Sequence, residues 1–389
     1  MHSTHTHPNS SALQASLEQS VAKERAPFLI GMTADAAGVT FSGAAGEAAP
    51  GRPAAVDSVL RIFSMTKAVG STAAMILVER GQLDLDAPVE SILPDFARLQ
   101  VLTGWNGDQP TFRAPRTKAT VRQLATHTSG LEYEFWCAEM NEYLTRTGRP
   151  SILTGTRDAL NYPLMTDPGT RWGYGISIDW LGLVVQKVSG QRIDAFVTEN
   201  ILQPLGMADT VFEPRPDMAP RLAKIKARGE DGKFANFEIN PPPHPEVYGM
   251  GHALYSTARD YLHFLRLFLN EGAVDGVRIL SKNSVRTMRQ NQMEPLKFAP
   301  MVTAIPSVSA DFDPFPGTVK TYTVGFLRNE ADIPGRRRAG SLSWAGVLNS
   351  HYWIDPASNV IGVIATQTLP FVEPPFMAAY EDFERAVYA

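Results

Sequence analysis

The sequence predicts an α/β fold, α+β in its layout, with an antiparallel sheet that is built from both termini and flanked by helices. An all-helical domain is expected to be inserted into it. Two observations carry this prediction. Short apolar or alternating runs typical of strands gather near both ends of the chain, and helical spacing of apolar residues fills its middle. No internal repeat is visible.

Length and composition limit the classes of protein to consider. The chain has 389 residues, of which 44% are hydrophobic and 20% charged, as in ordinary globular proteins with room for two domains. The net charge is −4, and no basic run stands out apart from Arg336–Arg338, so no nucleic-acid partner is indicated. These arginines follow a Pro-Gly pair and are expected to lie in a solvated loop.

Cysteine usage and the lack of long apolar segments indicate the cellular context. Cys137 is the single cysteine, which excludes a disulfide within the chain and favours a packed or reducible thiol. No apolar run reaches the length of a membrane span, and the N-terminus lacks a signal-peptide pattern. We therefore expect a cytoplasmic protein without a membrane partner. The sequence leaves its oligomeric state open.

The domain boundaries follow from the changes in pattern along the chain. Residues 1–20 are polar and are expected to form a disordered or weakly helical tail. The sheet domain is expected to comprise residues 21–84 and 250–389, and the helical inserted domain residues 85–249. Residues 98–118 carry Gly, Asn, Asp and Pro at turn positions and are expected to be a loop.

Individual elements are predicted in chain order. "PFLIGMTA" and "GVTFSGAAG", separated by "DAAG", predict a hairpin near the N-terminus. The apolar segment from Lys67 to Arg80 predicts a helix that ends at Gly81, and "SIDWLGLVVQKVSG" predicts one that ends at Gly190. Late in the chain, "TYTVGFLRNE", "AGSLSWAG" and "SHYWIDPASNVIGVIATQT" predict strands, and "PPFMAAYEDFERAVYA" predicts a terminal helix.

The first chemical candidate is the pair Ser64 and Lys67 in "FSMTKAV". Their spacing places both side chains on one side of a helix start, where a desolvated lysine can lose its proton and accept that of the serine. The spacing alone is weak, because Ser20 and Lys23 repeat it within a polar segment. Ser64 differs because it follows an apolar strand and opens an apolar helix, where the floor of a pocket can form.

A serine–lysine pair also needs a proton relay and an oxyanion site. Tyr174 stands between glycines in "RWGYGISIDW", and is either a phenol held in a cleft or a tyrosine packed on a helix end. Small residues in Trp344-Ala345-Gly346 would let a substrate carbonyl approach the backbone, unless they only mark a strand bulge. The backbone N–H groups of Ser64 and Val347 would then donate to the oxyanion.

The motifs in this order resemble one enzyme family. Ser-x-x-Lys, "HTSGL", Tyr174 in its turn, "PLGM", "GMGHALYST" and Trp-Ala-Gly are similar to the serine β-lactamase and penicillin-binding-protein fold. Within it, the resemblance is to the class C-like family VIII carboxylesterases and statin side-chain acyltransferases, over about residues 26–389. It implies Ser64 as nucleophile, Lys67 as its base or proton partner, and Tyr174 as the relay to the leaving group and the deacylating water.

Two departures from the lactamase pattern bear on the substrate. Tyr-x-Asn is replaced by Tyr174-Gly175-Ile176, which removes the amide that would orient an acylamido side chain. Lys-Thr-Gly is replaced by Trp344-Ala345-Gly346, which removes the cation that would bind a β-lactam carboxylate. Both changes favour neutral, hydrophobic esters, with Trp344 as an apolar wall.

The remaining candidates are weaker. By the resemblance, Tyr133 would line the cleft, whereas Phe135 and Trp136 could equally pack in the core. His127 is expected to hold its turn by hydrogen bonds. The histidines show no metal-ligand spacing, so neither a metal nor a cofactor is expected.

The function predicted from these residues is a serine carboxylesterase that forms an acyl-enzyme with a small-molecule ester, with a variant in which an alcohol replaces water as the acyl acceptor. A β-lactamase, D,D-peptidase or amidase, and a non-catalytic binding module of the same fold, are the alternatives. A Ser-His-Asp hydrolase is disfavoured because the chain contains no Gly-x-Ser-x-Gly elbow.

Overall fold

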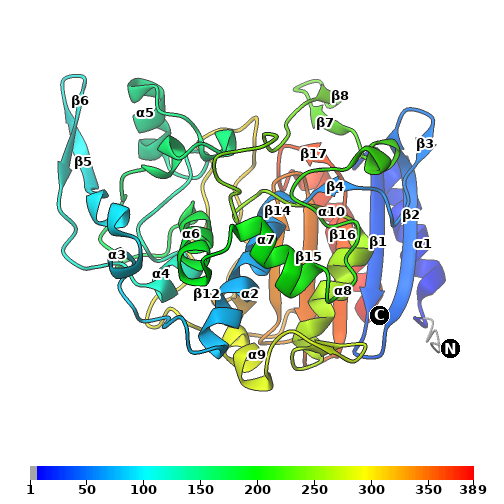
Figure 1. The fold of residues 1–389 in the computed structure, drawn as a ribbon. Helices are drawn as coiled ribbons and strands as arrows, with labels where there is room; N and C mark the ends of the chain where they lie inside the picture. The colour runs from blue at the N-terminus through cyan, green and yellow to red at the C-terminus, as the bar shows by residue number, and fades with distance from the viewer. Residues whose placement is uncertain (1–6) are drawn as a thin grey trace.

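An eight-stranded antiparallel sheet, formed by both ends of the chain, dominates the computed structural model, which describes residues 7–389 (Figure 1). Its strand order is β12-β13-β14-β15-β16-β1-β2-β3. The strands are β1 (Phe28–Ala34), β2 (Val39–Ala49), β3 (Arg52–Pro53), β12 (Lys320–Tyr322), β13 (Leu327–Asn329), β14 (Leu342–Gly346), β15 (Ser350–Asp355) and β16 (Val360–Ala365). The sheet confirms the predicted α/β fold and its construction from both termini.

Helices cover both faces of this sheet because its strands alternate apolar side chains between the two faces. Leu29, Trp353 and Ile364 face helices α1 (Ser10–Ala22) and α10 (Pro374–Tyr388). On the other face, Ile30 and Tyr352 join the large core that includes α8 (Ala258–Leu269). Neighbouring residues of one strand thus pack in two different cores. The core on the α1 and α10 side joins the helices from the two ends of the chain.

The N-terminal segment differs from the prediction of a tail over residues 1–20. Residues 10–20 belong to helix α1, in which Leu13 and Leu17 are fully buried against α10 and the sheet. Their spacing of four places both on one face of the helix, and this short apolar stripe is sufficient because the packing partner comes from the far end of the chain. Residues 1–6 lie outside the described part.

The middle of the chain is mainly helical, as predicted, but the inserted segment is not all-helical. Its helices are α3 (Val89–Ile92), α4 (Val121–Ala125), α5 (Ala138–Thr147), α6 (Ser177–Ser189) and α7 (Ile193–Val197). The segment predicted as a loop, 98–118, contains the hairpin of β5 (Val101–Asn106) and β6 (Gln109–Arg113). Gly107 turns this hairpin with a φ of 59°, so the turn residues that suggested a loop connect two strands.

A second group of strands lies at the edge of the inserted segment. Strands β7 (Ile225–Arg228) and β8 (Phe234–Phe237) form a hairpin, and β7 pairs in parallel with β17 (Thr368–Leu369). This contact joins the inserted segment to the C-terminal part of the chain. The division into two domains at residues 84 and 249 stays a prediction.

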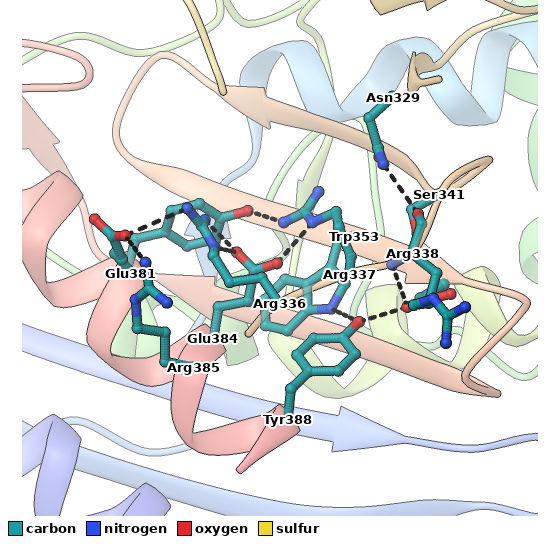
Figure 2. A network of polar contacts seen from close by, with 12 residues as sticks. Asn329, Arg336, Arg337, Arg338, Ser341, Trp353, Glu381, Glu384, Arg385 and Tyr388 are labelled. Carbon is teal, nitrogen blue, oxygen red and sulfur yellow. Dashed lines mark hydrogen bonds and ion pairs between the residues drawn. The ribbon is translucent and has the colours of Figure 1, made fainter. Parts of the chain in front are cut away.

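The arginine run Arg336–Arg338 is not the solvated loop that was predicted. Figure 2 shows it against helix α10, where the fully buried Arg337 donates from Nε to Glu384 Oε1 at 2.7 Å. Arg336 binds the same buried carboxylate, and of the three arginines only Arg338 is exposed. A buried guanidinium requires a partner of opposite charge, and that partner lies 47 residues away in the sequence. Local sequence therefore gave no sign of the burial.

Three further findings on the described residues bear on the predictions. None of the helices in residues 7–389 is both long and apolar enough to cross a bilayer. Within the same residues, no group of three or more His, Cys, Asp or Glu side chains could hold a metal ion. Cys137 is a buried free thiol, and burial raises its pKa to about 12.

Candidate active site

Ser64 lies on a short 3-10 turn, Phe63–Met65, which joins β4 (Leu60–Arg61) to helix α2 (Thr66–Glu79). Phe63 has a φ of 39°, a left-handed conformation that is costly for a residue with a large side chain. Its ring is buried with Leu348 and Leu369, and this packing holds the unusual backbone. The strained turn presents Ser64 at the N-terminal end of α2, where the helix dipole favours negative charge.

Lys67 projects one turn further along α2 and is fully buried. Its Nζ lies 3.2 Å from Ser64 Oγ, 3.0 Å from Tyr133 Oη and 2.9 Å from the carbonyl oxygen of Gly251. Burial lowers its pKa from 10.5 to about 7, because the ammonium loses its hydration, and the Asp179 charge acts in the opposite direction. A large share of Lys67 is therefore an uncharged amine near neutral pH, which can accept the proton of Ser64.

Tyr133 and Tyr174 flank this amine. The backbone N–H of Tyr133 donates to the Tyr174 carbonyl at 3.0 Å, and Lys67 Nζ lies 5.0 and 4.7 Å from the two ring centroids. Burial raises the pKa of Tyr174, while its hydrogen bonds with Ser64 and Trp344 act in the opposite direction. Burial also raises the pKa of Tyr133 well above its ordinary value. Both side chains are therefore protonated phenols that can donate a hydrogen bond.

The glycines beside Tyr174 serve close packing rather than a left-handed turn. A Cβ on Gly175 would lie 2.3 Å from the Leu131 carbonyl oxygen, and one on Gly173 would lie 2.6 Å from the Glu132 carboxylate. Only glycine lets the two segments pair backbone to backbone. The predicted role of His127 is consistent with this arrangement, since its carbonyl accepts from the Gly173 N–H at 2.9 Å and its Nδ1 from the Gly175 N–H at 3.4 Å.

Strand β14 forms the opposite wall. Trp344 donates from Nε1 to Tyr174 Oη at 3.1 Å, and its ring packs against that of Tyr174 with centroids 4.8 Å apart. β14 lies between β13 and β15, in the interior of the sheet. Gly346 packs against the backbone carbonyl of Ile62. A Cβ on Gly346 would lie 2.3 Å from that carbonyl oxygen.

An apolar cavity of about 220 Å³ brings most of the predicted residues together. Ser64, Tyr133, Tyr174, Trp344, Ala345 and Val347 all line it. Phe135 and Trp136, for which the sequence left core packing open, line it too. The other lining residues are mostly apolar and come from distant segments: Phe63, Leu153, Phe237, Ile239, Met301, Ile305, Val308, Phe312, Leu348, Leu369 and Phe371, with Glu134 and His252 as polar members.

Sequence reasoning missed three residues around Lys67. Asp179 is fully buried in the first turn of α6, the Gly251 carbonyl accepts from Lys67, and His252 lines the cavity. The motif "GMGH" was visible, but nothing in it indicated a contact with Lys67. Asp179 stands five residues after Tyr174 and could have been suspected only as an acidic residue within an apolar helix pattern.

Comparisons with known proteins find relatives that match most of the chain. The sequence profile of the β-lactamase family matches residues 17–386. The chain is 31% identical to monacolin J acid methylbutanoyltransferase from Aspergillus terreus over 350 residues, which cover 87% of this chain and 83% of that protein. It is 32% identical to lovastatin esterase from Penicillium rubens over 339 residues, 84% of each chain. A mutant of simvastatin synthase from Aspergillus terreus is similar in structure, with a TM-score of 0.85, 28% identity, and coverage of 98% of this chain and 96% of that one.

Proposed function

The chain belongs to the β-lactamase family, in which relatives about 30% identical to it are esterases and acyltransferases, and on this premise we propose that it is a serine carboxylesterase. In this proposal the reaction passes through an acyl-enzyme on Ser64, and an alcohol can replace water as the acyl acceptor. The observation that carries the proposal is the buried Lys67 amine, whose Nζ lies 3.2 Å from Ser64 Oγ.

Acylation follows from the protonation states of the site. The uncharged Lys67 amine takes the proton of Ser64 as Oγ attacks the ester carbonyl. The oxyanion is received by the N–H groups of Ser64 and Val347, which both line the cavity. Tyr174 donates its phenolic proton to the departing alcohol and is reprotonated by the Lys67 ammonium, so the bond that breaks releases a neutral alcohol.

Deacylation repeats these steps in reverse. Water, or a second alcohol, enters beside Tyr174 and passes its proton to the Tyr174–Lys67 pair as it attacks the acyl carbonyl. The collapse of the second tetrahedral intermediate returns the proton to Ser64. A dry cavity would slow the entry of water and so favours transfer to an alcohol that binds the apolar lining.

The lining supports a neutral, hydrophobic ester as substrate. Trp344 stands where the lactamase pattern carries its cation, and most lining side chains are apolar. The relative named lovastatin esterase supports the same reading, since its name describes the cleavage of a hydrophobic ester. A β-lactamase or D,D-peptidase is the alternative that shares the nucleophile, and the missing cation weighs against it.

A fluorophosphonate probe with mapping of the adduct tests the nucleophile. We expect labelling at Ser64, and we expect Ser64→Ala, Lys67→Ala and Tyr174→Phe each to lower the turnover of short-chain aryl esters by at least about 10³-fold. The matched control is Ser20→Ala with Lys23→Ala, a pair with the same spacing at the C-terminal end of α1, which should leave turnover unchanged. An adduct at another residue would refute the proposal, and nitrocefin turnover within about a hundredfold of ester turnover would favour the lactamase.

A further inference from the structure

Asp179 is linked to Lys67 through a single residue, Gly251. Its Oδ1 accepts the backbone N–H of Gly251 at 2.9 Å, and the carbonyl oxygen of Gly251 accepts from Lys67 Nζ at 2.9 Å. The Gly251 residue thus transmits the position of the carboxylate to the amine. Asp179 has no exposed surface and lies in the first turn of α6, where the helix dipole stabilises its negative charge.

The loop that carries Gly251 is shaped to reach this carboxylate. A Cβ on Gly249 would lie 2.5 Å from Asp179 Oδ1, and one on Gly251 would lie 2.5 Å from Oδ2. Larger residues at either position would push the loop away and remove the Gly251 carbonyl from Lys67. On the same side, His252 Nδ1 lies 3.4 Å from Asp179 Oδ1.

The charge of Asp179, rather than its capacity for hydrogen bonds, distinguishes it. Among the described residues its Oδ2 has no hydrogen-bond partner. A buried carboxylate is costly unless its charge interacts favourably with another group. That charge favours the ammonium form of Lys67 and opposes the desolvation that lowers the lysine pKa. Without it, the buried amine would hold a proton less well.

We propose that Asp179 is a positioning residue for Lys67, which aims the amine at Ser64 through the Gly251 carbonyl and places a negative charge beside it. The inference rests on the proposed function, because it takes Lys67 as the base that activates Ser64. It assigns a role to a carboxylate that makes no contact with the nucleophile.

The other titratable groups around the pair leave Asp179 as the charge to test. Tyr133 and Tyr174 stay protonated because burial raises their pKa, and His127 stays neutral because burial and the nearby Lys67 hold its pKa well below the ordinary value. His252 is the ionisable side chain that faces Asp179, with Nδ1 3.4 Å from Oδ1. The experiment therefore includes variants of both residues.

The test follows the rate of fluorophosphonate labelling of the full chain from pH 5 to pH 9. In the wild type we expect the rate to rise with pH as Lys67 loses its proton. Asp179→Asn keeps an oxygen for the Gly251 N–H but removes the charge, so the rise should move to lower pH by about one unit or more. His252→Asn should keep the position of the rise, since the titrating group is Lys67.

The matched control is Asp355→Asn. Asp355 is likewise fully buried and accepts backbone N–H groups, at Ser358 and Arg338, but it lies at the far end of β15. Asp355→Asn should keep the wild-type pH profile even if it lowers the unfolding free energy. Thermal unfolding of each variant checks the fold, and Asp179→Ser, which leaves room for water at the Gly251 N–H, is the second variant.

An unchanged pH profile in Asp179→Asn, or a rate that falls equally at every pH, would overturn the inference. So would the failure of both Asp179 variants to fold, since that would make the role purely structural. Loss of the pH-dependent rise in His252→Asn would assign the titration to His252 instead. Equal labelling of wild type and Ser64→Ala would refute the proposed function itself. The labelling of these two proteins is therefore compared before any pH profile is measured.

Discussion

Gly346→Ala tests whether the contact between β14 and the Ser64 turn sets the geometry of the site. The new Cβ would lie 2.3 Å from the carbonyl oxygen of Ile62, whereas ordinary contacts begin near 3.4 Å. The atom that it meets is backbone, so β14 and the turn must separate by about 1 Å. Val347 follows Gly346 directly, so this separation moves one proposed oxyanion donor away from the other, which is Ser64.

The expected loss is large in activity and small in stability. A displacement of about 1 Å at reacting groups, or the loss of one oxyanion donor, lowers the rate by about 10²-fold or more. The overpacking itself costs about 1–3 kcal/mol of unfolding free energy. The variant should therefore fold and bind substrate but turn it over slowly.

The assay is kcat/KM for a short-chain aryl ester, with urea unfolding of the same preparations. Gly38→Ala is the matched control, because a Cβ at Gly38 meets nothing within 4 Å and its φ is not left-handed. This control should match the wild type in both measurements. Wild-type turnover in Gly346→Ala, with the fold intact, would refute the reasoning that close approach at Ile62 aligns the oxyanion site.

Two further predictions concern buried charge. Glu384→Gln leaves Arg337 buried without its counter-charge and should lower the unfolding free energy by about 3–5 kcal/mol in urea unfolding. Glu381→Gln loses a surface pair with Arg385 and a longer contact of 3.8 Å with Arg336, and should move the midpoint much less; equal effects would contradict the distinction. Lys67→Met tests whether the buried lysine lowers the unfolding free energy of the wild type, as a buried charge should, instead of raising it as a stabilising contact would. The pKa of Lys67 falls from 10.5 in the unfolded chain to about 7 in the fold, so the unfolded state binds the extra proton between these values. The wild type should therefore gain stability relative to Lys67→Met by up to about 1.4 kcal/mol per pH unit as the pH rises through that window. Parallel stability curves for the two proteins from pH 7 to pH 9 would contradict this.

Most strands of the main sheet, the long helices after Ser64 and Tyr174, and the residues of the catalytic proposal were readable from local pattern. The short runs of apolar and aromatic residues in β15 and β16, and the glycine after α6, are features of a few neighbouring residues, so the sequence shows them directly. Ser64 and Lys67 are separated by one helical turn, which makes their contact a local one as well. The bond between Trp344 and Tyr174 spans 170 residues, and only the order of motifs in a known family pointed to it.

Where the sequence misled, burial depended on a distant partner. Helix α1 and Arg337 are polar or charged in their own surroundings, and both are buried by helix α10 from the far end of the chain. Asp179 belongs to the same class, since its carboxylate acquires a role only when the Gly251 loop folds over it. The sequence by itself determined the type of fold, and it supplied the proposed nucleophile and the lysine beside it. Only the tertiary structure decided which charges are removed from water, and with them how readily Lys67 releases its proton, because desolvation depends on everything that packs around a group rather than on its neighbours in the chain.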